Sequence, residues 1–391
     1  MRELSGGPGR GPDRHDIEAA APEGASLRRS PAGFLPRIEA LRGVAALTVV
    51  VYHVAPGMSA SAPRGWIDAL IYKIVAAAMN GPGAVVAFFV ISGFVLARSL
   101  EANPDPIRFF RNRLFRLFPA AAAVVALLAL LHWRFGIFVG YEANFTAANV
   151  ILNMLMIRSD INGPMWSMTV ECFATPLILF SVWLFHRRGE RALWALIAGL
   201  FVLSFFGTYA HLLGGFTDLS PLHAFVVGCL VHFRGARLAA AIGPGWTTPI
   251  AMLSVIVFGI CGSRHQSAIV AMLECLSAAT FVILVVWQPA AALFRPLDTG
   301  PARFFGKISY SFYLLHLLGI SLALRLVHPP DIYAAGIGVS AVTVLTTGVA
   351  ILLTAPAAYL SWRWIEVPAI RWGRSLGPTP AREGAPIPSP R

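Results

Sequence analysis

The stretch RIEALRGVAALTVVVYHV, from Arg37 to Val54, decides the class of this protein. Most of its residues are apolar, and its length approaches the ~20 residues that a membrane-spanning helix needs. It nevertheless contains Glu39, Arg42 and His53. Inserting an ionisable group at membrane depth costs about 2.5–3.5 kcal/mol, so such groups often mark functional sites.

The whole chain has the composition of an integral membrane protein. Of its 391 residues, 57% are hydrophobic and 13% are charged, whereas a soluble protein has roughly 25% charged residues. A net charge of +12 can indicate nucleic-acid binding. Here the basic residues lie in short loops between apolar segments, as the positive-inside rule requires. We therefore expect membrane lipid, and no nucleic acid, as a partner.

The apolar segments predict an all-α, polytopic integral membrane protein with about ten transmembrane helices. With both termini in the cytoplasm, 25 of the 31 Lys and Arg residues fall on the cytoplasmic side and six fall outside, which agrees with the positive-inside rule. Short interfacial helices are expected over 66–79 and 145–157. The predicted spans are 38–56, 81–98, 114–133, 165–186, 192–210, 219–234, 246–262, 268–288, 306–327 and 335–362.

The predicted membrane domain covers residues 34–374. Residues 1–33 have no apolar core of a cleavable signal peptide, and this segment and the tail 375–391 are expected to be disordered. The four cysteines lie in apolar segments without a CxxC pair, so we expect neither a disulfide framework nor a metal site.

Arg42 and His53 are eleven residues apart on the first predicted span. At 100° per residue this spacing is about 20° beyond three full turns, so both lie on one helix face, roughly 16 Å apart along the axis. Two structural explanations compete with a chemical one. Arg42 can extend to the headgroups, and His53 can hydrogen-bond to a neighbouring helix.

The segment RFFRNRLFRLFP, residues 108–119, holds two arginine pairs. Arg108 and Arg111 are three residues apart, as are Arg113 and Arg116, so each pair shares a helix face. Guanidinium groups bind phosphate oxygens in a bidentate manner. The segment therefore predicts a polyanion site at the cytoplasmic end of the third span, with anchoring by positive charge as the alternative.

Glu171 lies within the fourth predicted span, in MWSMTVECFATP, residues 165–176. A carboxylate at this depth needs a partner or water. It can orient a histidine, bind a sugar hydroxyl or join two helices. In FFVISGF, residues 88–94, the small Ser92–Gly93 step allows another helix or an acyl chain to approach the backbone.

The segment GKISYSFYLLH, residues 306–316, carries a polar stripe. Ser309, Tyr313 and His316 fall at helical spacing on one face, with Tyr310 beside them. A stripe of hydroxyl groups inside a membrane indicates either a wetted cavity or a seam of hydrogen bonds between helices.

In this order along one chain, these motifs resemble acyltransferase family 3, a family of integral membrane O-acyltransferases that modify polysaccharides, lipid-linked sugars and some antibiotics. Arg42–x10–His53 is similar to the family's first-span motif, and the arginine pairs are similar to its third-span motif. FFVISGF, WSMTVE, GKISYSFYLLH and the closing WIEVP are similar to further family blocks. The resemblance covers about residues 34–374. Some members of the family carry a hydrolase-like domain after the last span. Without such a domain in the same chain, passing the acyl group on to one is expected to need a separate partner protein.

The resemblance implies transfer of an acyl group, expected to be acetyl, from acyl-CoA to a hydroxyl of a carbohydrate, a lipid-linked sugar or a related acceptor. The implied location is the bacterial inner membrane. His53 is expected to be a general base that burial keeps neutral, with Glu171 as a second catalytic residue. The expected residues for acyl-CoA are Arg42, Arg108, Arg111, Arg113 and Arg116, and those for the acceptor are Trp166, Ser309, Tyr310, Tyr313 and His316.

Two other classes of protein compete with this interpretation. A solute transporter also has many spans with ionisable groups, but no internal repeat is evident. A glycosyltransferase that uses a lipid-linked sugar is expected to have acidic residues in an outer loop near the first spans. Residues 56–66 contain none.

Overall fold

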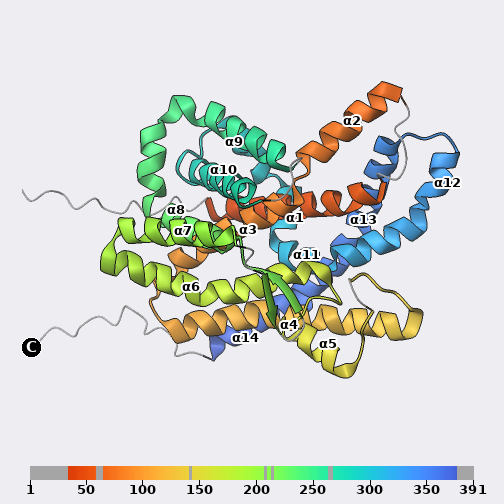
Figure 1. Cartoon of the computed structure of the whole chain (residues 1–391), viewed down its shortest axis with the longest axis horizontal. Helices are drawn as coiled ribbons and strands as arrows, with labels where there is room; N and C mark the ends of the chain where they lie inside the picture. Colours follow the sequence, from red (N-terminus) through yellow and green to blue (C-terminus); the bar gives the residue numbers. More distant parts are fainter. Residues whose placement is uncertain are drawn as a thin grey trace, which may run out of the picture. The chain divides into compact units, whose positions relative to one another are not determined.

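A computed structural model of the chain describes residues 34–376, apart from 59–64, 141–142, 207–208, 213–214 and 263–266 (Figure 1). The predicted disordered segment 1–33 lies outside the described residues, as does the predicted tail beyond Leu376. Ser375 is the last residue of a helix, so the ordered domain extends slightly past the predicted boundary at 374.

The described part of the chain is almost entirely helical. Its two short strands, β1 (Tyr209–Leu212) and β2 (Gly215–Asp218), form one antiparallel hairpin. Short 3₁₀ segments are η1 (Gly163–Met165), η2 (Pro244–Trp246) and η3 (Ala292–Asp298), and η4 (Trp362–Glu366) is a π-helix. The α-helices are α1 (Phe34–Met58), α2 (Gly65–Ala78), α3 (Gly81–Ala102), α4 (Pro106–Phe135), α5 (Ala147–Met154), α6 (Trp166–Arg188), α7 (Glu190–Ser204), α8 (Leu222–Ile242), α9 (Thr247–Gly262), α10 (Ala268–Trp287), α11 (Gly300–Val327), α12 (Pro329–Ala334), α13 (Val339–Ser361) and α14 (Val367–Ser375).

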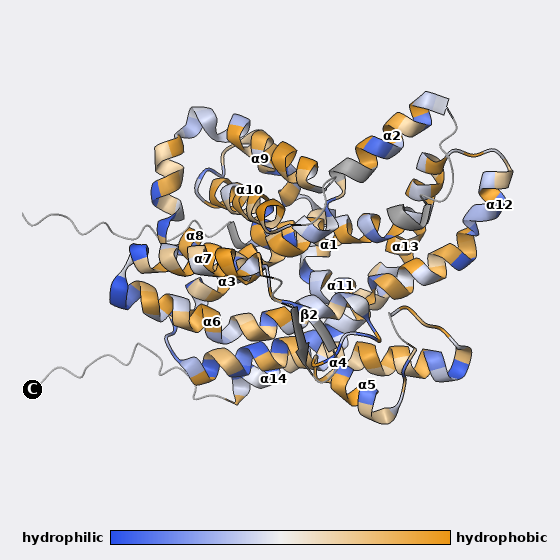
Figure 2. Cartoon of the chain, in the orientation of Figure 1, coloured by the Kyte–Doolittle hydropathy of each residue, from blue (hydrophilic) through white to orange (hydrophobic). Residues whose placement is uncertain are grey.

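Eight helical segments in the described residues are long and apolar enough to cross a membrane. They contain α3, α4, α6, α8, α9, α10, α11 and α13. Figure 2 shows hydrophobic residues along α9 and α10 and hydrophilic residues at helix ends, such as the turn between α6 and α7. These features confirm a polytopic all-α membrane protein. The other two predicted spans are helices as well, but α1 carries several charged residues and α7 is only 15 residues long.

Two predicted span boundaries are wrong. The predicted span 192–210 ends too late, because α7 stops at Ser204 and the chain enters the hairpin. Its apolar run continues past the helix, and apolar character alone does not distinguish a buried helix from a strand. The predicted span 219–234 ends too early, because α8 continues to Ile242 through an alanine-rich segment that favours helix. The two predicted interfacial helices are confirmed as helices α2 and α5.

α1 and α11 pack side by side over much of their length. A Cβ on Gly43 would lie only 2.5 Å from the backbone nitrogen of Gly306, so the two helix backbones touch there. Ten residues further along each helix, His53 contacts His316. The two helices therefore run parallel and in register. This packing matters because α1 carries Arg42 and His53, while α11 carries the polar stripe.

α3 and α8 also approach at backbone distance. A Cβ on Gly93 would lie 2.0 Å from the carbonyl oxygen of Phe225, and one on Gly228 would lie 2.2 Å from that of Val90. The small Ser92–Gly93 step therefore accommodates a helix, as small residues do at membrane helix interfaces.

Candidate active site

His53 and His316 form a pair at the predicted outer half of α1 and α11. The two ring centroids are 5.1 Å apart, and His316 Nε2 lies 3.4 Å from His53 Nδ1. His316 is almost fully buried, with 1% of its surface exposed, whereas the His53 side chain is exposed. The expectation that His53 is neutral stays a prediction. The buried imidazole of the pair is that of His316, and the exposed one is that of His53. We call these two residues the outer histidine pair.

The hydrogen bonds of the outer histidine pair assign its tautomers. Carbonyl oxygens only accept. His316 Nδ1, which is 2.5 Å from the Tyr313 carbonyl oxygen, therefore carries a hydrogen. His53 Nδ1, which is 2.9 Å from the Val49 carbonyl oxygen, carries one too. Neutral His316 then has its lone pair on Nε2, 3.4 Å from the same His53 Nδ1, whose hydrogen the Val49 carbonyl oxygen accepts over the shorter distance. The remaining lone pair of His53 is on Nε2, for which the described residues provide no hydrogen-bond partner.

Glu171 forms a buried ion pair with Arg113. The two residues are far apart in the sequence but close in space. Arg113 donates to Glu171 Oε2 over 2.7 Å, and both side chains are 8% exposed. The Ser92 hydroxyl donates to the other carboxylate oxygen over 3.1 Å. α3, α4 and α6 thus meet at this carboxylate. The sequence left three roles open for Glu171. Its contacts in the structure are those of a residue that joins helices.

Arg42 belongs to the same group of charges. It interacts electrostatically with Arg113, Arg116, Glu171 and Glu366. Three guanidinium groups therefore face two carboxylates, which leaves one positive charge in excess. We call these five residues the inner charge cluster. An ion group of this kind is stable inside a protein only when its members are paired and hydrogen-bonded.

Glu366 joins the inner charge cluster from the end of the last span. It is 3% exposed and accepts a hydrogen bond from the Ser311 hydroxyl over 3.2 Å. Ser311 also contacts Ser361. Glu366 lies in the π-helical segment η4, a rare geometry that is frequent at functional sites. The sequence alone did not connect Glu366 to Arg42.

The two arginine pairs of α4 do not form one cluster. At 100° per residue, the mean direction of Arg108 and Arg111 differs from that of Arg113 and Arg116 by about 140° around the helix. Arg113 and Arg116 interact with Arg42, whereas Arg108 and Arg111 do not contribute to its electrostatic surroundings. Within the described residues, Arg111 and Arg113 each have a buried Nε–H without a hydrogen-bond partner.

A small cavity connects the inner charge cluster with the polar stripe of α11. Its volume is about 20 Å³, enough for about one water molecule. Arg42 and Glu171 lie on its wall together with Ser309, Tyr310 and Tyr313. Tyr313 is also the residue whose carbonyl oxygen binds His316. Tyr313 therefore contacts both the cavity and the outer histidine pair, although neither histidine lines the cavity, and in this structure the cavity is too narrow for a substrate.

The stripe hydroxyls mainly join helices. Tyr310 donates to the Leu117 carbonyl oxygen over 2.6 Å, which links α11 to α4. The Tyr313 hydroxyl is 2.9 Å from the Ser167 hydroxyl and 3.2 Å from the Pro164 carbonyl oxygen, so it links α11 to the start of α6. For these two tyrosines the contacts are those of a hydrogen-bonded seam, although both side chains also line the small cavity.

The loop before α6 is held inside the protein by polar contacts. Asn162 is fully buried and donates to the Leu314 carbonyl oxygen of α11 over 2.9 Å. Asp160 accepts from Asn149, Asn153 and Arg158. Desolvation by itself raises the pKa of Asp160. These hydrogen bonds and the charge of Arg158 lower the pKa by more than desolvation raises it, so it lies below its ordinary value of 3.8. The carboxylate is thus held ionised, and the loop leads into Trp166, which lies against Phe89 of α3, and Ser167, which contacts Tyr313 of α11.

Trp166 lines a second, larger cavity of about 530 Å³. Asp218 and the hydroxyl groups of Ser204, Ser220 and Ser267 lie on the same wall. Val85 lines both this cavity and the small one. This second cavity, which we call the outer cavity, therefore adjoins the small cavity. The outer cavity offers an aromatic ring, a carboxylate and hydroxyl groups. Sequence analysis identified Trp166 but not Asp218 or the serines, which lie in segments without a recognisable motif.

The fold and the site together define a polytopic membrane protein with ionisable groups arranged across its membrane domain. The acyltransferase domain of acyltransferase family 3 matches residues 35–355, and the chain belongs to this family. Among the described residues, no group of three or more His, Cys, Asp or Glu side chains is arranged to hold a metal ion.

Curated relatives carry acyltransferase names. The chain is 24% identical over 383 residues to the O-acetyltransferase OatA of Staphylococcus aureus (strain NCTC 8325 / PS 47), with 87% of this chain and 58% of that protein covered. It is 25% identical over 327 residues to the acyltransferase MdmB of Streptomyces mycarofaciens, with 75% and 80% covered. The chain thus spans less than two thirds of the length of OatA. No solved structure matches it.

Proposed function

We propose that this protein transfers an acyl group, most simply acetyl, from acyl-CoA to a hydroxyl of a carbohydrate, a lipid-linked sugar or a related acceptor. The observation that carries the proposal is the parallel register of α1 and α11. It aligns the inner charge cluster, the small cavity and the outer histidine pair along one side of α1. Membership of the acyltransferase family supports the same conclusion. The bacterial inner membrane is the proposed location.

His53 acts as the general base in this proposal. Its Nε2 takes the proton of the acceptor hydroxyl while the hydroxyl oxygen bonds to the thioester carbonyl carbon. The carbon–sulfur bond then breaks, and the proton on His53 passes to the departing thiolate of CoA. A positioned base of this kind contributes about 10²–10⁴-fold to the rate. The Val49 carbonyl oxygen, which accepts from the His53 Nδ1–H over 2.9 Å, fixes the orientation of the ring together with the His316 ring that packs against it.

The inner charge cluster and the other arginines of α4 form the proposed donor end. The cluster has one excess positive charge, and among the described residues Arg111 and Arg113 each keep a buried Nε–H without a hydrogen-bond partner, which a phosphate oxygen would satisfy if the site opened. Arg108 and Arg111 lie on the other face of α4, closer to its predicted cytoplasmic end, where a nucleotide arrives first. In this role Glu171 holds Arg113 in place. We expect Arg108→Gln/Arg111→Gln to raise KM for acetyl-CoA with little change in kcat.

The outer cavity is the proposed acceptor end. Trp166 offers an aromatic face, while Asp218 and the neighbouring serines offer hydrogen-bonding groups suited to a polyhydroxylated ligand. Access from this cavity to His53 requires movement around Val85 and Trp166, because the small cavity beyond them holds only about one water. Ser309, Tyr310 and Tyr313 would then line the opened passage.

The experiment is incubation of membranes that contain the protein with radiolabelled acetyl-CoA. Label in a glycan, lipid or added sugar acceptor supports the proposal, and its absence from membranes without the protein is the control. CoA-independent uptake of a solute into vesicles, with no transfer of label, would instead identify a transporter.

A further inference from the structure

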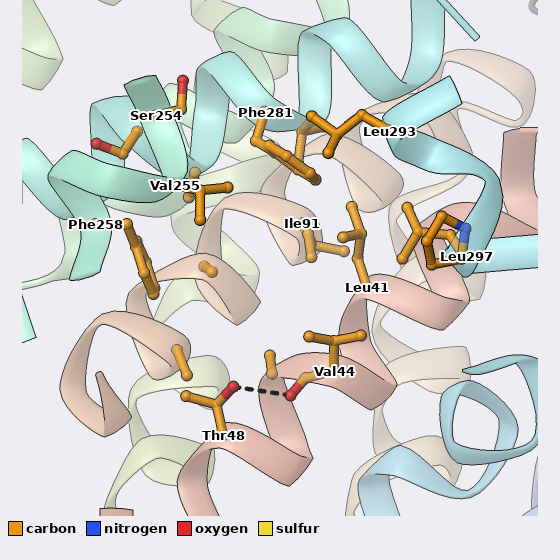
Figure 3. Close-up of a pocket in the computed structure, with 17 residues that line it drawn as sticks. Leu41, Val44, Thr48, Ile91, Ser254, Val255, Phe258, Phe281, Leu293 and Leu297 are labelled. Carbon is orange, nitrogen blue, oxygen red and sulfur yellow. Dashed lines mark hydrogen bonds between the residues drawn. The ribbon is translucent and has the colours of Figure 1, made fainter. Parts of the chain in front are cut away.

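A third cavity, distinct from the candidate active site, lies between α1, α3, α9, α10 and η3 (Figure 3). Its volume is about 350 Å³, within the usual range of ligand pockets. Leu41 and Thr48 of α1 are both on its wall, and seven residues of helix separate them. The cavity therefore extends roughly 10 Å along α1.

The wall of this cavity is apolar. Side chains such as Ile91, Val255 and Phe281 project from three helices towards the same space (Figure 3). The Thr48 hydroxyl donates to the Val44 carbonyl oxygen over 3.1 Å, and the Ser254 hydroxyl donates to the Ile250 carbonyl oxygen over 2.8 Å. These two hydroxyls are thus satisfied within their own helices, and Ser277 adds one further hydroxyl to an otherwise apolar wall. Such a wall suits a hydrocarbon chain and offers a sugar or nucleotide few partners.

One end of the cavity is bounded by η3, on the side that the charge bias predicts to be cytoplasmic. Leu293 and Leu297 line the cavity, and Arg295 lies between them in the sequence. The Arg295 side chain is exposed, and within the described residues it has no hydrogen bond or ion pair. Nearby, Asp298 binds Arg37 over 2.6 Å and Arg303 over 3.4 Å. The mouth of the cavity therefore has a net positive charge.

We propose that this cavity binds one acyl chain of an anionic phospholipid of the inner leaflet, with the lipid phosphate near Arg295. The apolar wall fits the chain, and the positive mouth fits the headgroup. Basic residues at a membrane surface attract anionic lipids in this way. The site is separate from the proposed chemistry, because the cavity lies on a different face of α1 from Arg42 and His53. Leu41, Val44 and Thr48 are centred about 135° away around the helix.

The test uses the full-length protein in nanodiscs that contain phosphatidylglycerol with a photoactivatable group in its acyl chain. After irradiation, the cross-linked peptides are mapped by mass spectrometry. We expect cross-links concentrated on the α1 segment 41–48 and the α10 segment 277–282. Cross-links spread evenly over all lipid-facing helices would overturn the proposal, and this measurement requires no variant.

Two variants separate the chain site from the headgroup site. Ala278→Phe fills the cavity and is expected to remove the preferred cross-links, whereas Val344→Phe, at a 61% exposed position on α13, leaves them unchanged. Arg295→Gln is expected to lower cross-linking by phosphatidylglycerol but not by phosphatidylcholine, and the exposed Arg237→Gln is its control. Unchanged cross-linking in folded Ala278→Phe protein, or equal effects of Arg295→Gln and Arg237→Gln, would contradict the proposal. Radiolabelled acetyl transfer is not needed for either measurement.

Discussion

The inner charge cluster and the outer histidine pair lie on the same two-helix framework but are built differently. The cluster is buried, and each carboxylate in it has a hydrogen-bond partner. The histidine pair combines one buried ring with one exposed ring, and the exposed ring keeps a nitrogen for which the described part of the chain offers no partner. Paired charges hold helices together and set the local electrostatic potential, whereas a free lone pair on an imidazole nitrogen can accept a proton. We therefore expect the two regions to fail differently when mutated.

The largest effect is expected at the exposed ring. His53→Ala removes the proposed base and should lower the acetyl-transfer rate by about 10²–10⁴-fold, with thermal unfolding in detergent close to that of the unmodified protein. His186→Ala, in an exposed pair with Glu101, is the matched control and should keep full activity. Transfer at an undiminished rate in His53→Ala would remove His53 from the mechanism.

The inner charge cluster should respond mainly in stability. Arg113→Ala leaves the Glu171 carboxylate buried without its ion partner, which costs about 3–5 kcal/mol in the free energy of unfolding. Replacing both partners, as Arg113→Met/Glu171→Leu, should recover most of this loss, although it should not recover acyl-CoA binding. Denaturant unfolding of the purified protein measures both variants, with the exposed Arg187→Ala as control. Equal stabilities for the single and double variants would show that the pair is not coupled.

The packing of α1 against α11 connects the two regions, and it can be disturbed where Gly43 contacts Gly306. In Gly43→Ala the added methyl group meets the backbone of Gly306, and overpacking of this kind costs about 1–3 kcal/mol. Because α1 and α11 must separate, the contact between His53 and His316 should lengthen and transfer should slow. Gly199→Ala, where a Cβ meets nothing within 4 Å, should leave activity unchanged. If both variants behave alike, the register of the two helices does not control the site.

The smallest effect is expected at His316, which acts through His53. His316→Phe keeps an aromatic ring but removes the second, longer polar contact of the His53 Nδ1–H, whose nearer acceptor is the Val49 carbonyl oxygen; even a full hydrogen bond contributes only about 0.5–1.5 kcal/mol. We expect kcat to fall about tenfold at most, with an altered pH–rate profile. His316→Gln restores an acceptor and should recover part of both. A slower His316→Phe enzyme with an unchanged pH–rate profile would indicate a packing role only.

Much of the architecture could be predicted from local sequence, because a helix that crosses a membrane must be a long apolar run. The positions of Arg42 and His53 on one face also follow from helix geometry. Only the structure shows that His53 is the more exposed ring of the histidine pair, since exposure depends on which neighbours surround the end of α1. The four arginines of α4 were treated as one cluster because they are close in sequence, although the helix directs the two pairs to different sides.

By itself, the sequence determined the polytopic helical class, the motif order of the family and the spacing of Arg42 and His53, because each depends on residues close together in the chain. Only the tertiary structure decided that Glu171 is the ion partner of Arg113, that Glu366 joins Arg42, and that His316 orients His53. These pairs are separated by 58, 324 and 263 residues. A charge inside a membrane must find a partner, but local sequence does not specify which helix will bring it.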